Sequence, residues 1–206
     1  MSKLIINTNL ESRKFILDIN CTINFSDGLI GVYGPSGSGK TLFLRVIAGL
    51  EKNSIGKIIF NDIIFQDKSN NIFLNTSQRK AIFVFQENRL FSHLKVRENI
   101  LFGFRRNINK NLNRISFDDI VDRLKIRYLL DRDIIDLSGG EKQRVSIARS
   151  LLSDMNILLL DEPFSAQDIY VKKEIISIIK DIYKLSNIPI IIVSHSIDDL
   201  VKLTNK

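Results

Sequence analysis

The residues best suited to chemistry begin with a glycine-rich segment near the N-terminus. The segment reads Gly34, Pro35, Ser36, Gly37, Ser38, Gly39, Lys40 and Thr41. It matches the pattern of a phosphate-binding loop, in which glycines let successive backbone N–H groups point at one anion. We expect Lys40 to reach the β- and γ-phosphates of a nucleotide and Thr41 to ligate Mg²⁺. A Gly/Ser loop without a ligand would not require so many constrained positions, so the segment indicates a nucleoside triphosphate site.

A pair of carboxylates forms the second chemical element. Asp161 and Glu162 directly follow the apolar run Ile157–Leu160. We expect Asp161 to hold Mg²⁺, directly or through water, and Glu162 to orient or deprotonate an attacking water. A plain exposed turn is the alternative interpretation, and the phosphate loop in the same chain disfavours it.

A third element lies in the segment from Leu137 to Arg144. Ser138 and Glu141 have the spacing of a capping box that opens a helix. The adjacent Gly139 and Gly140 would expose the backbone N–H groups of that helix start, which makes a second anion site. Two phosphate-binding elements in one chain indicate that two chains share each nucleotide.

The elements that position these residues follow an α/β pattern, because short apolar runs alternate with amphipathic stretches. We expect strands at 29–33, 58–64, 81–85, 157–160 and 190–193, and helices at 40–50 and 171–185. A further helix is predicted after Ser116, with an apolar face that includes Ile120, Val121, Leu124 and Tyr128. The predicted fold is a P-loop NTPase core with a mainly parallel sheet. One domain would span residues 1–206, with the core in 1–86 and 151–206 and a helical subdomain in about 87–150.

Composition narrows the class of protein. The chain has 206 residues, of which 44% are hydrophobic and 26% charged, which is typical of a folded protein. No apolar run approaches the ~20 residues that a bilayer requires. The net charge of +7 comes from scattered basic residues, so we expect a solvated surface and no nucleic-acid partner. Cys21 is the only cysteine, which fits a reducing compartment and predicts a small buried side chain.

With the segment from Leu137 to Arg144 lying between the phosphate loop and the strand end at Asp161-Glu162, the three motifs resemble the ATP-binding cassette (ABC) family, and the resemblance covers nearly the whole chain. It implies an ATPase that uses ATP and Mg²⁺ and pairs head to tail as a homodimer. Ser138, Gly139 and Gly140 of one copy would close over the nucleotide of the other. The resemblance also implies that Gln86 senses Mg²⁺ and the γ-phosphate, and that His195 contacts the γ-phosphate; with Glu162 these would be the catalytic residues.

The segment from Arg89 to Ile100 is similar to that of importer cassettes, above all the molybdate-importer ATPase group. This resemblance implies integral membrane permease subunits as partners and, indirectly, an extracytoplasmic substrate-binding protein. It also implies a peripheral position on the cytoplasmic side of the membrane and an inorganic oxyanion such as molybdate as cargo.

Three positions depart from the family pattern. Gln167 stands where the dimer-interface loop at 165–168 usually has an apolar residue. Phe15 is only an imperfect candidate for stacking on adenine. Family members continue with further strands beyond the position of Lys206, so we expect a truncated C-terminal part of the sheet. The alternatives that stay open are a soluble ABC clamp unconnected with transport and a truncated cassette with impaired hydrolysis.

Overall fold

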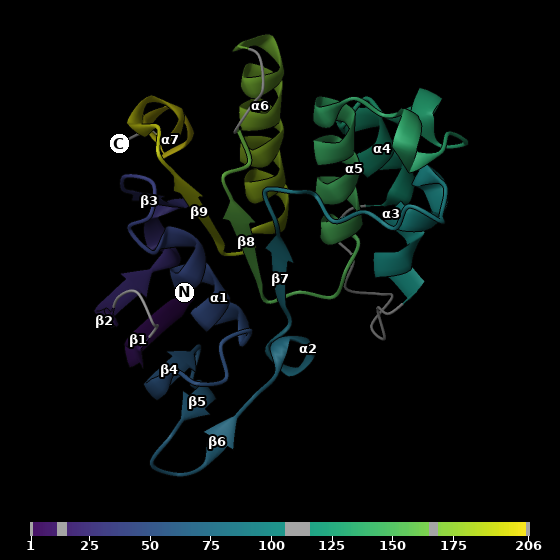
Figure 1. Cartoon of the computed structure of the whole chain (residues 1–206). Coiled ribbons are helices and arrows are strands. Elements are labelled where there is room, and N and C mark those ends of the chain that lie inside the picture. Colours follow the sequence, from purple (N-terminus) through teal and green to yellow (C-terminus); the bar gives the residue numbers. More distant parts are fainter. Residues whose placement is uncertain (1, 12–15, 106–115, 165–168, 205–206) are drawn as a thin grey trace.

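The structure, a computed structural model, describes residues 2–11, 16–105, 116–164 and 169–204 (Figure 1). Its strands form two sheets. The antiparallel sheet has the order β2 (Ile16–Asn24), β1 (Lys3–Glu11), β4 (Ile55–Phe60), β5 (Ile63–Asp67) and β6 (Ile72–Phe73). The parallel sheet has the order β3 (Ile30–Tyr33), β9 (Ile190–Ser194), β8 (Ile157–Asp161) and β7 (Ala81–Val84). The helices are α1 (Lys40–Ala48), α2 (Thr76–Arg79), α3 (Val96–Arg105), α4 (Phe117–Arg123), α5 (Gly139–Leu151), α6 (Ile169–Ser186) and α7 (Ile197–Thr204).

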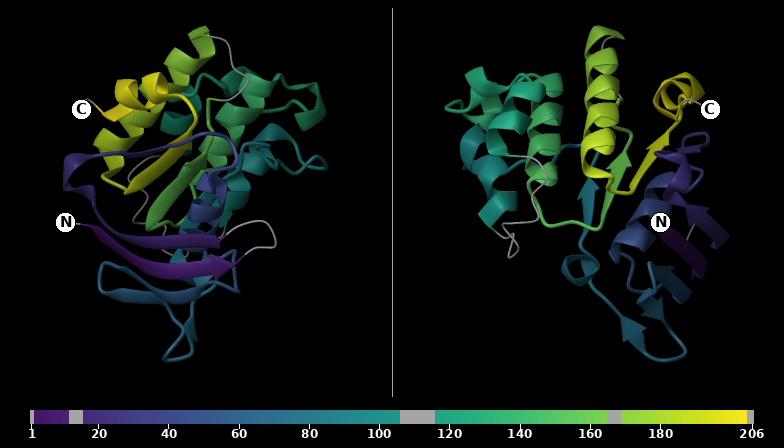
Figure 2. Two further views of the ribbon diagram at one scale, coloured as in Figure 1. Left: turned by 60° about the vertical axis from the view of Figure 1, so that its left-hand side comes forward. Right: turned by 180° about the vertical axis from the view of Figure 1, so that it is seen from behind.

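The parallel sheet is buried on both faces, which explains the continuous apolar runs that mark its strands. Every residue of β8 is buried. Leu158 and Leu160 belong to the core shared with α5 and α6, whereas Ile157 and Leu159 belong to the core around α1 and β1. Helix α1 therefore packs between the two sheets, an arrangement visible in Figure 2. The predicted parallel core is confirmed.

The antiparallel sheet corrects one element of the sequence-based prediction. The single strand expected at 58–64 is two strands, because Asn61 and Asp62 form a turn with φ angles of 46° and 68°. Both residues tolerate positive φ better than most, and two such residues in succession suit a tight hairpin. The Asn61-Asp62 pair was therefore a signal for a turn, which the apolar residues on both sides of it made easy to overlook.

Helices α3, α4 and α5 form a helical lobe beside the parallel sheet (Figure 1). The predicted capping boxes are confirmed at both helix starts: Ser116 caps α4 with Asp119, and Ser138 caps α5 with Glu141. Tyr128 was placed wrongly on the apolar face of α4. The helix ends at Arg123, and Tyr128 lies in the short 3₁₀ helix Arg127–Leu129 with 61% of its surface exposed.

A fully buried arginine ties α1 to the antiparallel sheet. The guanidinium of Arg79 donates hydrogen bonds to the carbonyls of Val46 and Ile47 at the end of α1 and to that of Leu74. It adds donors to carbonyls in the last turn of the helix, of which that of Val46 also accepts the N–H of Gly49, and its charge suits the helix dipole. Burial lowers the pKa of Arg79 to about 10. This contact holds one end of the helix whose other end begins at Lys40.

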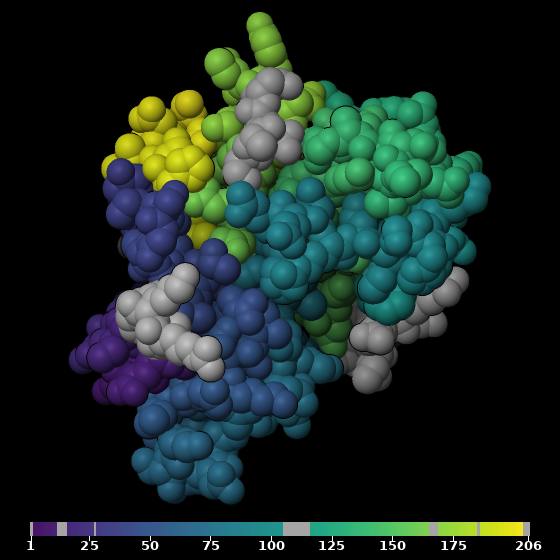
Figure 3. All heavy atoms as spheres, viewed as in Figure 1, coloured from purple at the N-terminus to yellow at the C-terminus, as the bar shows by residue number. Residues whose placement is uncertain are grey.

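At the opposite edge, α7 covers β3. A Cβ on Gly31 would lie 3.2 Å from a methyl group of Leu200. Figure 3 shows the yellow α7 directly beside the blue segment around residue 30.

Cys21, expected to be buried, is only half-buried on β2, and burial still raises the pKa of its thiol. No helix within the described ranges is both long and apolar enough to cross a membrane.

Candidate functional site

Most of the predicted site residues meet at one edge of the parallel sheet. The glycine-rich loop follows β3, Asp161 ends β8, and Ser194 ends β9, with Asp161 opposite Val193 and Tyr33 opposite Ser194. Because the strands are parallel and in register, their carboxyl ends place these side chains together. Open α/β sheets bind ligands at this edge.

The glycine-rich loop is shaped to expose its backbone. Gly37 and Gly39 adopt φ angles of +82° and +92°, a left-handed region that side chains disfavour. A Cβ on Gly34 would lie 2.8 Å from the hydroxyl of Ser38, which is closer than real Cβ contacts. Helix α1 begins immediately after Gly39, so its free N–H groups face the loop. The conformation fits the anion site expected from the sequence.

Lys40 lies folded back over this loop. Its ammonium donates to the carbonyl oxygens of Gly34 and Pro35 at 2.8 and 3.0 Å, and it is 3.7 Å from Oε1 of Glu162. The Lys40 side chain is 9% exposed and that of Glu162 is 12% exposed. The cation is therefore held at the mouth of the loop, where an entering phosphate would exchange for the two carbonyls.

Thr41 and Asp161 present two oxygens side by side. The hydroxyl of Thr41 donates to Oδ1 of Asp161 at 2.9 Å. Burial raises the pKa of the Asp161 carboxyl, the Thr41 hydrogen bond lowers it, and the charge of Glu162 raises it. A carboxylate whose charge is disfavoured by burial suits an incoming dication, and oxygen ligands suit Mg²⁺. Within the described residues, no group of three or more His, Cys, Asp or Glu could hold a metal ion.

Glu162 and His195 form a direct pair. Nδ1 of His195 lies 2.8 Å from Oε2 of Glu162, and the imidazole remains 55% exposed. Glu162 has a φ of 47°, and its N–H donates to the carbonyl of Val193 on β9. This left-handed backbone turns the glutamate out of the plane of β8, so that Asp161 and Glu162 face different partners.

Two predicted groups lie apart from this cluster. Gln86 follows β7 at the same sheet edge, but its side chain is exposed and makes no hydrogen bond within the described part of the chain. Ser138, Gly139 and Gly140 begin α5 in the helical lobe, on another side of the parallel sheet from α1 (Figure 1). The loop at 165–168 and Phe15 lie outside the described residues.

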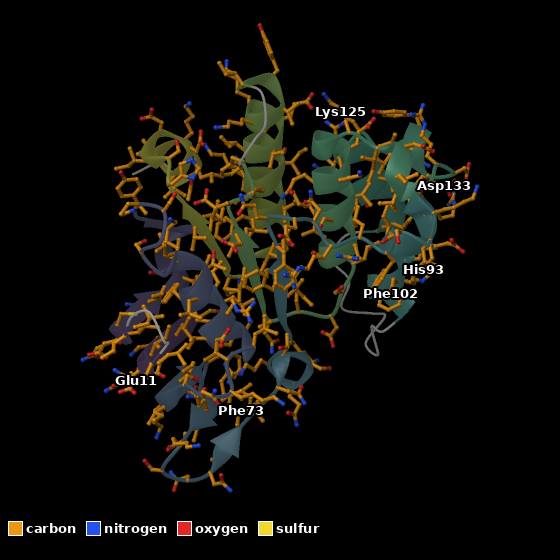
Figure 4. The ribbon with its side chains drawn as sticks, viewed as in Figure 1. Glu11, Phe73, His93, Phe102, Lys125 and Asp133 are labelled. Carbon is orange, nitrogen blue, oxygen red and sulfur yellow. The ribbon has the colours of Figure 1, made fainter. Side chains whose placement is uncertain are left out.

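An aromatic cavity opens between the helical lobe and the start of β7. Its volume is about 550 Å³. Its aromatic lining residues are Phe83, Phe85, Phe91 and Phe102. Figure 4 shows Phe102 and His93 on the same side of the helical lobe.

Arginines line the same cavity. The guanidinium of Arg89 lies 3.8 Å from the ring centre of Phe85, and that of Arg149 lies 5.2 Å from that of Phe91. Burial lowers the pKa of Arg149, and its guanidinium donates a hydrogen bond to the carbonyl of Asn88. A third cation of the lining, Lys80, is paired with Asp154 at 2.6 Å. The lining thus combines an apolar floor with an excess of positive charge.

Sequence reasoning missed three residues that support these sites, namely Arg79, Asn99 and Arg149, and it missed the contact of Tyr128 with Glu141. Asn99 is fully buried, and its amide bonds both the N–H and the carbonyl of Phe91 beside the cavity. A polar residue inside the apolar period of a helix was the available signal for Asn99. Arg79, Tyr128 and Arg149 acquire their roles from partners distant in sequence, so no local pattern marks them.

Comparisons with known proteins agree with this geometry. The family described as "ABC transporter" matches residues 17–165. The protein named "Molybdenum import ATP-binding protein ModC" of Pseudomonas fluorescens is 40% identical over 97% of the chain and 55% of its own length. The protein of the same name from Haemophilus influenzae is 40% identical over 98% of the chain and 56% of its own length. The chain thus spans about half the length of the curated relatives it matches.

Solved structures show the same fold. A dimeric post-hydrolysis state of the ATP-binding cassette MJ0796, bound to ADP and Pi, has a TM-score of 0.74 and 25% identity, and covers 98% of this chain and 91% of that one. A second dimeric structure of MJ0796, a bacterial ABC transporter cassette, gives a TM-score of 0.73 and 26% identity with the same coverage. On the matched family and these relatives, the chain belongs to the ABC transporter family of ATP-binding cassettes.

Proposed function

We propose that this chain is the ATP-binding and ATP-hydrolysing subunit of an ABC importer, with an inorganic oxyanion such as molybdate as the cargo. The observation that carries the proposal is the cluster at the sheet edge. Lys40, Thr41, Asp161, Glu162 and His195 come from three separated parts of the sequence and lie within contact of one another. Together with the shaped glycine loop they supply each group that phosphoryl transfer to water needs.

The protein residues would act mainly by position and charge. The loop N–H groups and Lys40 would cradle the phosphates, and Thr41 and Asp161 would hold Mg²⁺. The ion, when bound, would neutralise charge on the β- and γ-phosphate oxygens. Glu162 would orient a water and accept its proton, while His195 fixes the direction of the Glu162 carboxylate. Gln86, at the same edge, would move toward the nucleotide.

A second copy would complete the site. Ser138, Gly139 and Gly140 form an anion site at the start of α5, and the structure does not bring them to the loop of the same chain. Head-to-tail pairing would bring each α5 start to the nucleotide of the other copy. The two MJ0796 structures are described as dimeric, which supports the pairing of two copies.

The aromatic cavity would receive a cytoplasmic segment of a permease. Its phenylalanines would bury an apolar side chain, and the excess positive charge at Arg89 and Arg149 favours a segment that also presents a carboxylate. Such a position implies a peripheral protein on the cytoplasmic side of the membrane. The extracytoplasmic binding protein would act only through the permease.

The cargo assignment rests on the names of the relatives. The cargo itself would not touch this chain. Uptake of radioactive molybdate by cells that carry the permease and binding protein, with this chain or with its Lys40→Ala variant, tests the assignment. Uptake that requires Lys40 and is outcompeted by unlabelled molybdate supports it, whereas uptake independent of the chain contradicts it.

The decisive experiment on the motor is the mass in solution of the Glu162→Gln variant, measured by light scattering with and without ATP and Mg²⁺. We expect a monomer without nucleotide and a dimer with it, together with ATP hydrolysis by the unchanged chain. If the chain hydrolyses ATP but this hydrolysis is not linked to transport in any membrane preparation, the soluble-clamp alternative is favoured. ATP binding without dimer formation or hydrolysis would favour a cassette with impaired hydrolysis.

A further inference from the structure

Tyr128 connects the helical lobe to the start of α5. Its hydroxyl donates a hydrogen bond to Oε1 of Glu141 at 2.9 Å. The guanidinium of Arg132 lies 5.7 Å from the centre of its ring. The tyrosine is 61% exposed, so burial of its ring contributes little to the stability of the fold. The hydrogen bond of its hydroxyl is its main specific interaction in the described structure.

Glu141 has a separate partner on each carboxylate oxygen. Oε2 accepts the N–H of Ser138 at 2.8 Å, while the N–H of Glu141 donates to the Ser138 hydroxyl at 3.3 Å. Burial raises the pKa of Glu141, whereas the hydrogen bonds from Ser138 and Tyr128 lower it. The lowering is the larger effect, so the pKa lies below its ordinary value. The carboxylate is therefore ionised at neutral pH and bridges Tyr128 and Ser138.

The direction of this carboxylate matters for an anion site. Glu141 stands three residues after Ser138, at the end of α5 that would face a γ-phosphate. A freely rotating negative charge there would repel the phosphate and release the Ser138 N–H. With one oxygen held by Tyr128, the other stays on the N–H of Ser138, so the carboxylate keeps one direction at the helix start.

We propose that Tyr128 is a positioning residue for the signature segment at residues 138–140, acting through Glu141. This inference rests on the proposed function, in which that segment closes over the nucleotide of a second copy. Tyr128 would touch neither the nucleotide nor the reacting atoms. Its loss would therefore weaken closure of the dimer and leave ATP binding by a single chain intact.

The test compares Tyr128→Phe with Tyr183→Phe, both in the Glu162→Gln background. The phenylalanine keeps the ring beside Arg132 and removes only the hydroxyl. Tyr183 lies on α6 next to Gly28, away from the signature, and serves as the matched control. Three quantities are measured: amide hydrogen exchange of residues 138–141 without nucleotide, ATP affinity of the monomer, and the ATP concentration that gives half-maximal dimer.

We expect faster exchange at Ser138 and Glu141 in Tyr128→Phe. Half-maximal dimer should need about 3- to 10-fold more ATP, the scale of the net contribution of one typical hydrogen bond. Monomer affinity and the Tyr183→Phe control should match the parent. A general loss of structure would lower monomer affinity as well, and that result would overturn a positioning role.

Unchanged exchange at residues 138–141 in Tyr128→Phe would also overturn the proposal. If the Glu162→Gln parent forms no dimer with ATP, the head-to-tail pairing of the proposed function fails. The exchange measurement then decides the link from Tyr128 to Ser138 by itself, because it needs neither nucleotide nor a second copy.

Discussion

Nδ1 of His195 lies 2.8 Å from Oε2 of Glu162, while Oε1 of the same carboxylate is 3.7 Å from the ammonium of Lys40. The glutamate is thus held between a residue after β9 and the first residue of α1. Its backbone adopts a φ of 47°, so the position depends on the strand end as well as on the side-chain partners. These contacts orient the group that we assign to water activation, and they motivate the first two predictions.

Replacing Glu162 with glutamine should leave ATP binding intact and lower the hydrolysis rate by at least ~100-fold, the scale of losing one general base. The amide keeps the shape of the side chain and loses its ability to accept the proton. Steady-state phosphate release and binding of a fluorescent ATP analogue measure the two effects. Glu11→Gln, at the end of β1 in the antiparallel sheet (Figure 4), is the control and should hydrolyse ATP normally. Near-normal hydrolysis by Glu162→Gln would remove the glutamate from its role.

Replacing His195 with alanine should lower kcat by about 10- to 100-fold, because Glu162 loses the partner that fixes its direction. The KM for ATP should change less, since the phosphate loop and Lys40 are untouched. His93→Ala is the matched control, because its exposed imidazole lies in the helical lobe (Figure 4). Equal losses in both histidine variants would contradict a specific role for His195.

Replacing Asp161 with asparagine should raise the melting temperature of the nucleotide-free protein by a few degrees near neutral pH. Burial raises the pKa of Asp161 in the folded state. The folded protein therefore bears a penalty for the charged form above that pKa, and the penalty disappears as the pH falls through it. The advantage of asparagine should accordingly shrink in melts at about pH 4.

The same Asp161→Asn variant should lose the stabilisation that Mg²⁺ and ATP give together, because a ligand for the cation is removed. Asp154→Asn, which loses only the pair with Lys80, is the control and should retain that stabilisation. A lower melting temperature of Asp161→Asn without nucleotide would show that the carboxylate stabilises the fold, contrary to the direction of its pKa shift.

Replacing Arg79 with methionine should lower the free energy of unfolding by roughly 3 kcal/mol, because the carbonyls of Val46, Ile47 and Leu74 each lose a hydrogen bond from a buried guanidinium. Urea titration measures the change. Arg45→Met on α1, which breaks a partly exposed ion pair with Glu51, should change the free energy of unfolding by less than about 1 kcal/mol. Equal effects of the two substitutions would show that Arg79 contributes no more than a surface charge.

Replacing Arg89 with glutamate should weaken association with the permease by at least about 10-fold, because it reverses a charge at the cavity. Co-purification from detergent with the permease measures this. Arg97→Glu is the control: Arg97 is also an exposed arginine of the helical lobe, and it faces Asp131 and Phe117 instead of the cavity. Hydrolysis by the isolated chain should be unaffected in both variants. A permease that binds Arg89→Glu normally would place its docking surface elsewhere.

The sequence by itself determined the local chemistry and the elements that carry it. Short segments are sufficient to predict three features: the phosphate loop, the strand end at Asp161-Glu162, and the capping boxes at Ser116 and Ser138. The backbone conformation at these places depends on neighbouring residues. Continuous apolar runs identified the parallel strands, because strands that are buried on both faces require apolar residues at successive positions.

Only the tertiary structure decided which of these segments meet. Strand order brought His195 against Glu162, and the turn at Asn61-Asp62 made two strands where the apolar pattern indicated one. Tyr128 does not lie on the predicted apolar face and instead donates a hydrogen bond to Glu141. Arg79 donates to carbonyls of a helix more than thirty residues earlier in the chain. Such contacts depend on how separate segments pack, and the periodicity of one segment carries no information about the surface it will meet.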